Sequence, residues 1–248
     1  MKPYNNWLDE VVAAVSVAPY YRDDAVVIFN ADCKEIVPHI PRADLLLTDP
    51  PYGIGKDGQS QSTGGHGGRK AYDFLGWDGM RPERSLFDML TAKTGAQIIW
   101  GGNYFADMLP AHGKWLVWDK GQRINQSDGE LAYTSMDGAL RIYTLNRVAL
   151  MQDGAQHPTQ KPEELIRWCI QQADPVQTIL DPFAGSGTTG RAAKDLGRKA
   201  VLIEREERYC EISAKRMAQE VLPLEYRSND QAQAAPLAAS SLERLVGQ

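Results

Sequence analysis

Residues 43–52 read ADLLLTDPPY, and this stretch decides how the chain folds. Its apolar part, up to Thr48, is short enough to be a buried strand. Asp49 follows, and then come two prolines that cannot continue a strand ladder or a helix, so the turn is stiff. Because open α/β sheets bind ligands where their strands end, we predict a rigid binding turn here.

The turn places a carboxylate, a backbone carbonyl and an aromatic ring in one geometry. Asp49 and the Asp49–Pro50 carbonyl supply hydrogen-bond acceptors, and Tyr52 supplies a flat face. Such a cluster suits a planar base with an exocyclic amino group, which would stack on the ring and donate both amino hydrogens. A strand-end turn with a capping aspartate is the simpler alternative.

A glycine-rich segment follows a second predicted strand, residues 176–180. It reads DPFAGSGTTG over residues 181–190, with Gly185, Gly187 and Gly190 in G-x-G-x-x-G spacing. This spacing lets the backbone pass close to a ligand and starts a helix whose N–H groups face it. No lysine follows the glycines, which argues against a phosphate-binding P-loop.

An acid follows the next predicted strand, residues 199–203. Glu204 lies about 20 residues after the first glycine, a position that suits the two hydroxyls of a ribose. A nucleoside cofactor is therefore predicted. A plain surface acid is the alternative for Glu204, because Glu206, Glu207 and Glu211 are close in sequence.

Together these motifs resemble the DNA amino-methyltransferases that use S-adenosylmethionine. The resemblance spans residues 25–217: residues 49–52 are similar to the family's catalytic motif, residues 181–187 to its cofactor loop, and residues 101–104 to a segment after the next strand. The catalytic motif precedes the glycine loop. That order is typical of the circularly permuted beta group, in which the target-recognition segment lies between the two.

The resemblance implies roles for individual residues. The candidate catalytic residues are Asp49, Pro50, Pro51 and Tyr52. The candidate cofactor-binding residues are Asp32, Lys161, Asp181, Phe183, Gly185, Gly187, Thr188 and Glu204. Among them, Asp32 would meet the cofactor adenine and Asp181 its ammonium group. Structural alternatives are a turn residue for Asp32, an N-cap of the next helix for Asp181 and a solvent-facing position for Lys161.

The implied activity is methyl transfer to the N6 of adenine in double-stranded DNA. The target base must leave the duplex to be reached. Cytosine N4 is the close alternative, and the aspartate that opens residues 49–52 favours adenine. A dehydrogenase that uses NAD and a DNA-binding regulator without activity are more distant alternatives.

The implied fold is α/β, with a mostly parallel seven-stranded methyltransferase sheet, helices on both faces and a circularly permuted order. We predict a methyltransferase domain over residues 1–221, with a target-recognition segment at 120–156, and a flexible tail at 222–248. Residues 53–73 are rich in glycine and poor in large apolar side chains, so they are predicted to form a mobile loop. Candidate DNA contacts in this loop are Lys56, Arg69 and Lys70.

Helices are predicted at residues 8–15, 82–93, 162–172, 191–196 and 206–220. Strands are predicted at residues 25–29, 44–48, 97–100 and 114–118, and at the two segments next to the cofactor motifs. Residues 130–134 and 139–144 are predicted to pair with each other as an antiparallel hairpin.

Bulk composition excludes some classes of protein. The chain has 248 residues, of which 43% are hydrophobic, and a net charge of −5. No apolar run approaches the 18 residues of a membrane span, and the polar start of the chain has no signal-peptide pattern. Three scattered cysteines form no metal motif, so we expect a cytoplasmic monomer or homodimer with buried thiols and no structural metal.

Overall fold

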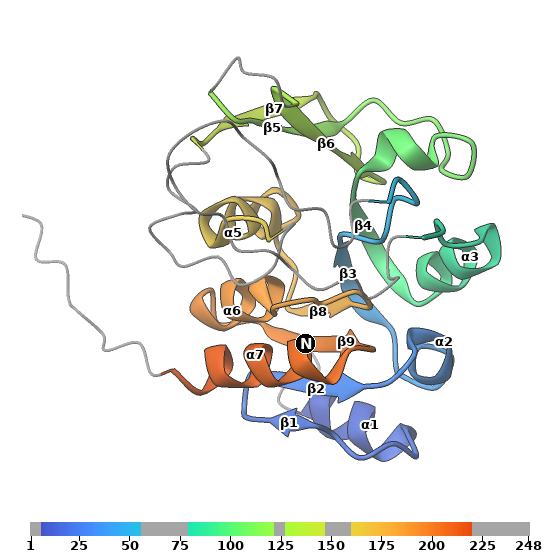
Figure 1. Ribbon diagram of the computed structural model, residues 1–248, viewed down its shortest axis with the longest axis vertical. Helices are drawn as coiled ribbons and strands as arrows, with labels where there is room; N and C mark the ends of the chain where they lie inside the picture. The colour runs from blue at the N-terminus through green and yellow to red at the C-terminus, as the bar shows by residue number, and fades with distance from the viewer. Residues whose placement is uncertain (1–5, 56–78, 122–126, 147–159, 220–248) are drawn as a thin grey trace, which may run out of the picture.

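The computed structural model describes residues 6–55, 79–121, 127–146 and 160–219. Their centre is a nine-stranded sheet with the order β1-β2-β9-β8-β3-β4-β6-β5-β7 (Figure 1). The strands are β1 (Tyr21–Arg22), β2 (Val26–Asn30), β3 (Ala43–Thr48), β4 (Thr94–Trp100), β5 (Trp115–Asp119), β6 (Gly129–Thr134), β7 (Arg141–Thr144), β8 (Thr178–Asp181) and β9 (Lys199–Glu204).

Helices cover both faces of the sheet. One face carries α5 (Glu163–Gln172), α6 (Thr188–Asp195) and α7 (Glu207–Ala218), and the other carries α1 (Trp7–Ala14), α2 (Cys33–Ile36) and α3 (Arg84–Ala92) (Figure 1). Each face has its own apolar cluster. The predicted mostly parallel sheet with helices on both sides is confirmed.

The central strands are buried on both faces, which explains why they are apolar without alternation. Strands β2, β9, β8, β3 and β4 are parallel neighbours in that order. Five carboxyl ends therefore meet at one edge of the sheet.

Asp44 fixes the register between β3 and β8. Its Oδ2 accepts hydrogen bonds from the backbone N–H groups of Gln177 and Thr178 at 2.8 and 2.9 Å. Its own N–H donates to Thr178 Oγ1 at 2.8 Å. A polar residue inside an apolar strand is thus used to align two segments that are far apart in sequence.

Two predictions about the sheet are corrected. The described sheet has nine strands instead of seven, with the two-residue β1 at one edge and β7 at the other. The predicted hairpin of residues 130–134 and 139–144 is wrong. β5 lies between β6 and β7, antiparallel to the first and parallel to the second. Strand β5 buries Leu116 and Trp118 between its two neighbours, and this packing places it between β6 and β7.

Helix α6 begins three residues earlier than predicted, at Thr188. Its N-cap is Gly187, which has a φ of +78°. Asp181 is the last residue of β8, so its interpretation as the N-cap of this helix is wrong.

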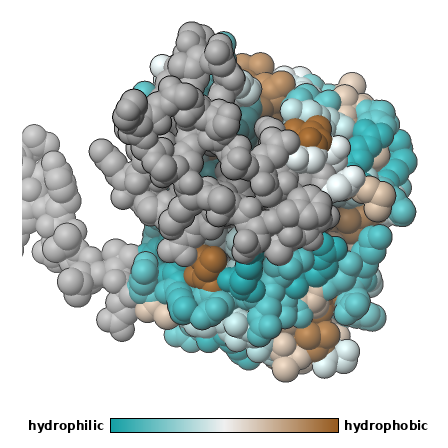
Figure 2. Space-filling model, viewed as in Figure 1, coloured by the Kyte–Doolittle hydropathy of each residue, from teal (hydrophilic) through white to brown (hydrophobic). Residues whose placement is uncertain are grey.

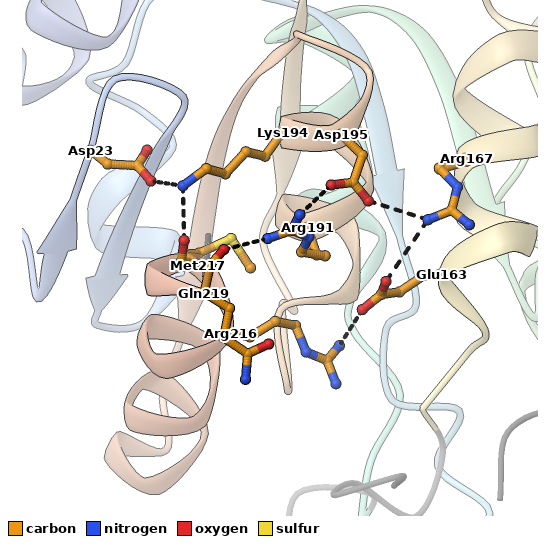
Figure 3. A network of polar contacts seen from close by, with 9 residues as sticks. All are labelled: Asp23, Glu163, Arg167, Arg191, Lys194, Asp195, Arg216, Met217 and Gln219. Atoms are coloured by element: carbon orange, nitrogen blue, oxygen red, sulfur yellow. Dashed lines mark hydrogen bonds and ion pairs between the residues drawn. The ribbon is translucent and has the colours of Figure 1, made fainter. Parts of the chain in front are cut away.

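Charged side chains join α5, α6 and α7 (Figure 3). Asp195 accepts from Arg191 at 2.5 Å and from Arg167 at 3.2 Å. Glu163 then links Arg167 to Arg216 at 3.8 Å on each side. Isolated ion pairs of this kind contribute little to stability. A network shared by three helices on one face of the sheet restrains how those helices pack behind the glycine loop.

The surface seen in Figure 2 is mostly hydrophilic, with apolar side chains in separate small patches. No helix in the described part of the chain is long and apolar enough to cross a membrane. Cys33, Cys169 and Cys210 are buried and free, as predicted.

Gly187 provides a test of this packing. A Cβ there would lie 2.0 Å from Ser213 Oγ and 2.8 Å from Ser213 Cβ, in a left-handed backbone conformation. Gly187→Ala should therefore lower the free energy of unfolding by about 3 kcal/mol through strain and overpacking. Gly197→Ala is the matched control, because its φ is +67° but no atom lies within 4 Å. Strain alone should cost it about 1 kcal/mol. Equal losses in denaturant titration would contradict the packing argument.

Candidate functional site

A cavity of about 180 Å³ opens where the parallel strands end. It is lined by residues that follow or end β2, β3, β4, β8 and β9. Nine of the residues predicted from sequence line it: Asp32, Asp49, Pro51, Lys161, Asp181, Phe183, Gly185, Thr188 and Glu204. Pro50, Tyr52 and Gly187 lie next to lining residues and do not line it themselves.

Asp49 lies directly after β3 and forms an ion pair with Lys161. The Lys161 ammonium contacts Asp49 Oδ2 and is only 5% exposed, so the solvent-facing alternative for Lys161 is wrong. Burial would lower the pKa of Lys161, but the carboxylates of Asp49 and Glu130 outweigh it and raise the pKa. Burial raises the pKa of Asp49 despite the ammonium beside it. The pair thus lies in surroundings that penalise an isolated charge.

Two residues of the predicted target-recognition segment, residues 120–156, extend this ion pair. Glu130 on β6 lies 3.3 Å from Lys161 through Oε2, and its Oε1 lies 2.7 Å from Lys120 Nζ. Burial would raise the pKa of Glu130, but Lys161 and Lys120 lower it to about 2. Glu130 is therefore a carboxylate throughout the physiological range.

Tyr52 is held at the other side of Asp49. Its hydroxyl donates to Asp49 Oδ1, and its ring stacks on Tyr104 with 4.7 Å between centroids. A Cβ at Gly101 would lie 2.1 Å from Tyr52 Cε1, so the ring packs directly on the glycine. Burial and the carboxylate of Asp49 raise the pKa of Tyr52. The hydroxyl therefore stays protonated and serves as a donor.

Asp181 ends β8 and is buried behind the turn. Its Oδ1 accepts from Thr48 Oγ1 at 2.9 Å and from the Phe183 N–H at 3.2 Å. Burial raises the pKa of Asp181 to about 6, although these donors lower it. Such a carboxylate is incompletely compensated, which suits a cationic ligand group.

Glu204 ends β9 and faces the glycine loop. Its Oε2 accepts from the Gly185 N–H at 2.8 Å and its Oε1 from the Glu206 N–H at 2.9 Å. The surface-acid interpretation is wrong, since Glu204 lines the cavity. Asp32 combines two roles: it caps α2 by accepting from the Lys34 N–H at 2.8 Å, and it lines the same cavity.

Sequence reasoning missed several residues of this site, chiefly Trp100, Glu130 and Lys120. Trp100 ends β4, lines the cavity and is 1% exposed. Its indole N–H has no hydrogen-bond partner within the described ranges. Glu130 could have been found, because it alternates with Ala132 and Thr134 on the buried side of its strand, where an acid is unusual.

Some predicted residues lie outside the described residues. These are Lys56, Arg69 and Lys70 and the tail at 222–248. Of the loop at 53–73 only residues 53–55 are described.

The α/β fold, with a cavity at the carboxyl ends of its parallel strands, is the fold of the solved DNA methyltransferases that the chain resembles. Residues 99–215 match the family model described as DNA methylase. This match confirms the resemblance to the N6/N4 amino-methyltransferases that the motifs predict, a family whose methyl donor is S-adenosylmethionine.

Two bacterial methyltransferases are similar to a part of the chain. Type II methyltransferase M.HinfI of Haemophilus influenzae is 47% identical over 62 residues, which are 25% of this chain and 17% of that protein. Type II methyltransferase M2.DpnII of Streptococcus pneumoniae is 48% identical over 66 residues, 26% of this chain and 25% of that protein. The chain therefore matches a quarter or less of the length of these relatives.

Solved structures resemble the chain over a larger share. The M1.HpyAVI–SAM complex has a TM-score of 0.54 at 23% identity, covering 77% of this chain and 99% of that one. The PvuII DNA methyltransferase, described as cytosine-N4-specific, has a TM-score of 0.57 at 15% identity, covering 84% and 92%. At these identities the likeness shows the fold.

The raised pKa of Asp181 predicts how cofactor binding depends on pH. A protonated carboxyl attracts an ammonium group poorly, so affinity for S-adenosylmethionine should rise with pH up to about 6 and level off above it. Titration calorimetry at several pH values measures this. Asp181→Asn should bind more weakly and lose the rise. An Asn variant with the wild-type pH dependence would assign the effect to other acids, such as Glu204 or Asp49.

Proposed function

We propose that this chain transfers a methyl group from S-adenosylmethionine to the N6 of adenine in double-stranded DNA. The observation that carries the proposal is the position of Asp49 and Tyr52, which meet at the end of β3 beside a cavity formed by the glycine loop. The domain limits predicted from sequence are part of the same proposal.

The cavity has groups that match the parts of the cofactor. Glu204, beside the glycine loop, would bind the ribose hydroxyls. Asp32, just after β2, would contact the adenine, and Asp181 would bind the ammonium group. The buried indole N–H of Trp100 is a donor without an acceptor among the described residues, and such groups are uncommon in proteins unless a ligand or water completes them. A carboxylate on the ligand would complete it.

The cofactor, when bound, supplies an electrophilic methyl group on a positively charged sulfur. The protein must then make the amino nitrogen of the base a better nucleophile. We infer that Asp49 and the Asp49–Pro50 carbonyl accept both amino hydrogens and draw the nitrogen toward tetrahedral geometry. Each oxygen of Asp49 already accepts one hydrogen bond, and a carboxylate oxygen has a second lone pair for the base.

Tyr52 would stack on the extruded base. Base stacking on an aromatic ring contributes about 1–3 kcal/mol, which offsets part of the cost of extrusion. Tyr104 already covers one face of the ring, so the base must use the opposite face or displace Tyr104. The candidate phosphate contacts remain Lys56, Arg69 and Lys70.

Adenine is proposed over cytosine because an aspartate opens the motif at residues 49–52. The fold itself does not discriminate, since the PvuII enzyme that it resembles is described as cytosine-N4-specific. The chemistry proposed for Asp49 serves either base.

The role of Asp49 predicts a specific loss. Asp49→Asn keeps the size of the side chain but replaces one acceptor oxygen by a donor, so methyl transfer should fall about a thousandfold or more. Affinity for S-adenosylmethionine should change little, because Asp49 is proposed to contact the amino group of the base. Transfer of labelled methyl to DNA and calorimetry measure the two effects. Activity within tenfold of wild type would remove Asp49 from the mechanism.

The product identifies the base. Mass spectrometry of digested, treated DNA should show N6-methyladenine. If N4-methylcytosine were the only methylated base, the target would be cytosine, and the proposed mechanism would still hold. Neither product, with DNA and S-adenosylmethionine both bound, would favour the regulator without activity.

Glu204 should affect binding and not chemistry. Glu204→Gln keeps an oxygen for the Gly185 N–H but loses the charge that receives two ribose hydroxyls, so the Kd for S-adenosylmethionine should rise about tenfold. The maximal rate should recover at saturating cofactor. Glu211→Gln is the matched control, because this acid is exposed and pairs with Lys215. A similar Kd for both variants and wild type would contradict the ribose contact.

A further inference from the structure

Four charged side chains form a continuous row that ends at the proposed catalytic carboxylate. Lys120 contacts Glu130 at 2.7 Å, Glu130 lies 3.3 Å from Lys161, and Lys161 contacts Asp49. They come from four separate places in the chain: the residue after β3, the residue after β5, strand β6, and the segment before α5. The row is neutral, with two ammonium groups and two carboxylates.

An aromatic ring lies beside each ammonium group of the row. Lys161 Nζ lies 5.1 Å from the centre of the Trp100 ring, and Lys120 Nζ lies 5.1 Å from that of Trp118. The two ammonium groups belong to residues that are 5% and 7% exposed. Water therefore screens these charges poorly, and each depends on its neighbours in the row.

We propose that Glu130 is a positioning residue for methyl transfer, which keeps Lys161 charged and directed at Asp49. This inference rests on the proposed role of Asp49. It assigns a catalytic contribution to the segment that the sequence predicts to serve target recognition.

The argument is one of charge balance. Without the Glu130 carboxylate, the row would contain two buried ammonium groups and only one carboxylate, that of Asp49. Lys161 would then lose its proton more easily, because one of the two anions that oppose the effect of burial is gone. A neutral Lys161 leaves Asp49 without a counterion, and a buried carboxyl without a counterion takes up a proton. A protonated Asp49 offers fewer acceptors for the amino hydrogens.

Other titratable groups around the row are few. Tyr52 and Asp181 act on Asp49 from the turn and from β8, and Cys169 on α5 faces Lys161. The pKa of Cys169 is raised by burial, so it carries no charge at neutral pH. Glu130 and Asp49 are thus the anions that act on Lys161 among the described residues.

The test is the pH dependence of single-turnover methyl transfer in Glu130→Gln. We expect a fall of about tenfold to a hundredfold at neutral pH with an unchanged Kd for S-adenosylmethionine. We also expect the rate to decline further at alkaline pH, in a range where the wild type is constant, because the pKa of Lys161 is lowered. An unperturbed rate, or a loss with the wild-type pH profile, would overturn the proposal.

A second variant separates charge balance from packing. Lys120→Gln combined with Glu130→Gln makes the row neutral again, so the double variant should recover part of the rate and the wild-type alkaline profile. Lys120→Gln alone should keep that profile, because Glu130 still faces Lys161. Additive losses in the two variants would indicate a purely structural role and overturn the proposal.

The outcomes distinguish this inference from the proposed function. If wild-type protein transfers no methyl group, the proposed function fails. If the wild type is active, Asp49→Asn is inactive and Glu130→Gln is normal, only the role of Glu130 fails. If Glu130→Gln does not fold, Glu130→Met replaces it: it removes the charge at a similar side-chain length, and a wild-type rate would overturn the proposal.

Discussion

The parallel pairing of β3 with β8 is the constraint on which the site depends. Asp44 locks the start of this pair through the backbone of Gln177 and Thr178, across 133 and 134 positions in sequence. At the other end of the same pair, Thr48 donates to Asp181 at 2.9 Å. The distance between the turn at residues 49–52 and the glycine loop is therefore set by the register of β3 and β8. The segments that follow β3 and β8 lead to helices on opposite faces of the sheet. The crevice between them is where open α/β sheets bind ligands.

Three acids at this edge are compensated in three different ways. Asp49 has an ammonium partner and Glu204 accepts two backbone N–H groups. Asp181 has hydroxyl and backbone donors and, in the part of the chain that the structure describes, no cationic partner. Burial raises the pKa of Asp181 to about 6, so a bound cation would stabilise its carboxylate form. A positively charged cofactor would reduce the repulsion among all three.

The sequence predicted the elements that have strong local signals. The apolar runs of β3, β8 and β9 and the motifs that follow them were sufficient to place Asp49, Asp181 and Glu204 at one edge, because parallel strands have few ways to pair. The pairing of β5, β6 and β7 was predicted wrongly, since adjacent strands in sequence are hairpin candidates and only tertiary packing on Trp118 decides otherwise. Lys161 was assigned to the cofactor site, and its partner Asp49 is 112 positions away, beyond the range of any local pattern.

Strand β6 supports the turn at residues 49–52 in two ways. Its Glu130 side chain reaches Asp49 through Lys161, and the neighbouring Leu131 carbonyl accepts from the Gly101 N–H at 2.8 Å. Gly101 in turn carries the ring of Tyr52. One strand thus supports the carboxylate through charge and the aromatic ring through the backbone. A displacement of β6 would change both proposed contacts to the base together. It would thereby couple residues 120–156 to the proposed methyl transfer, even where they do not touch the reacting atoms.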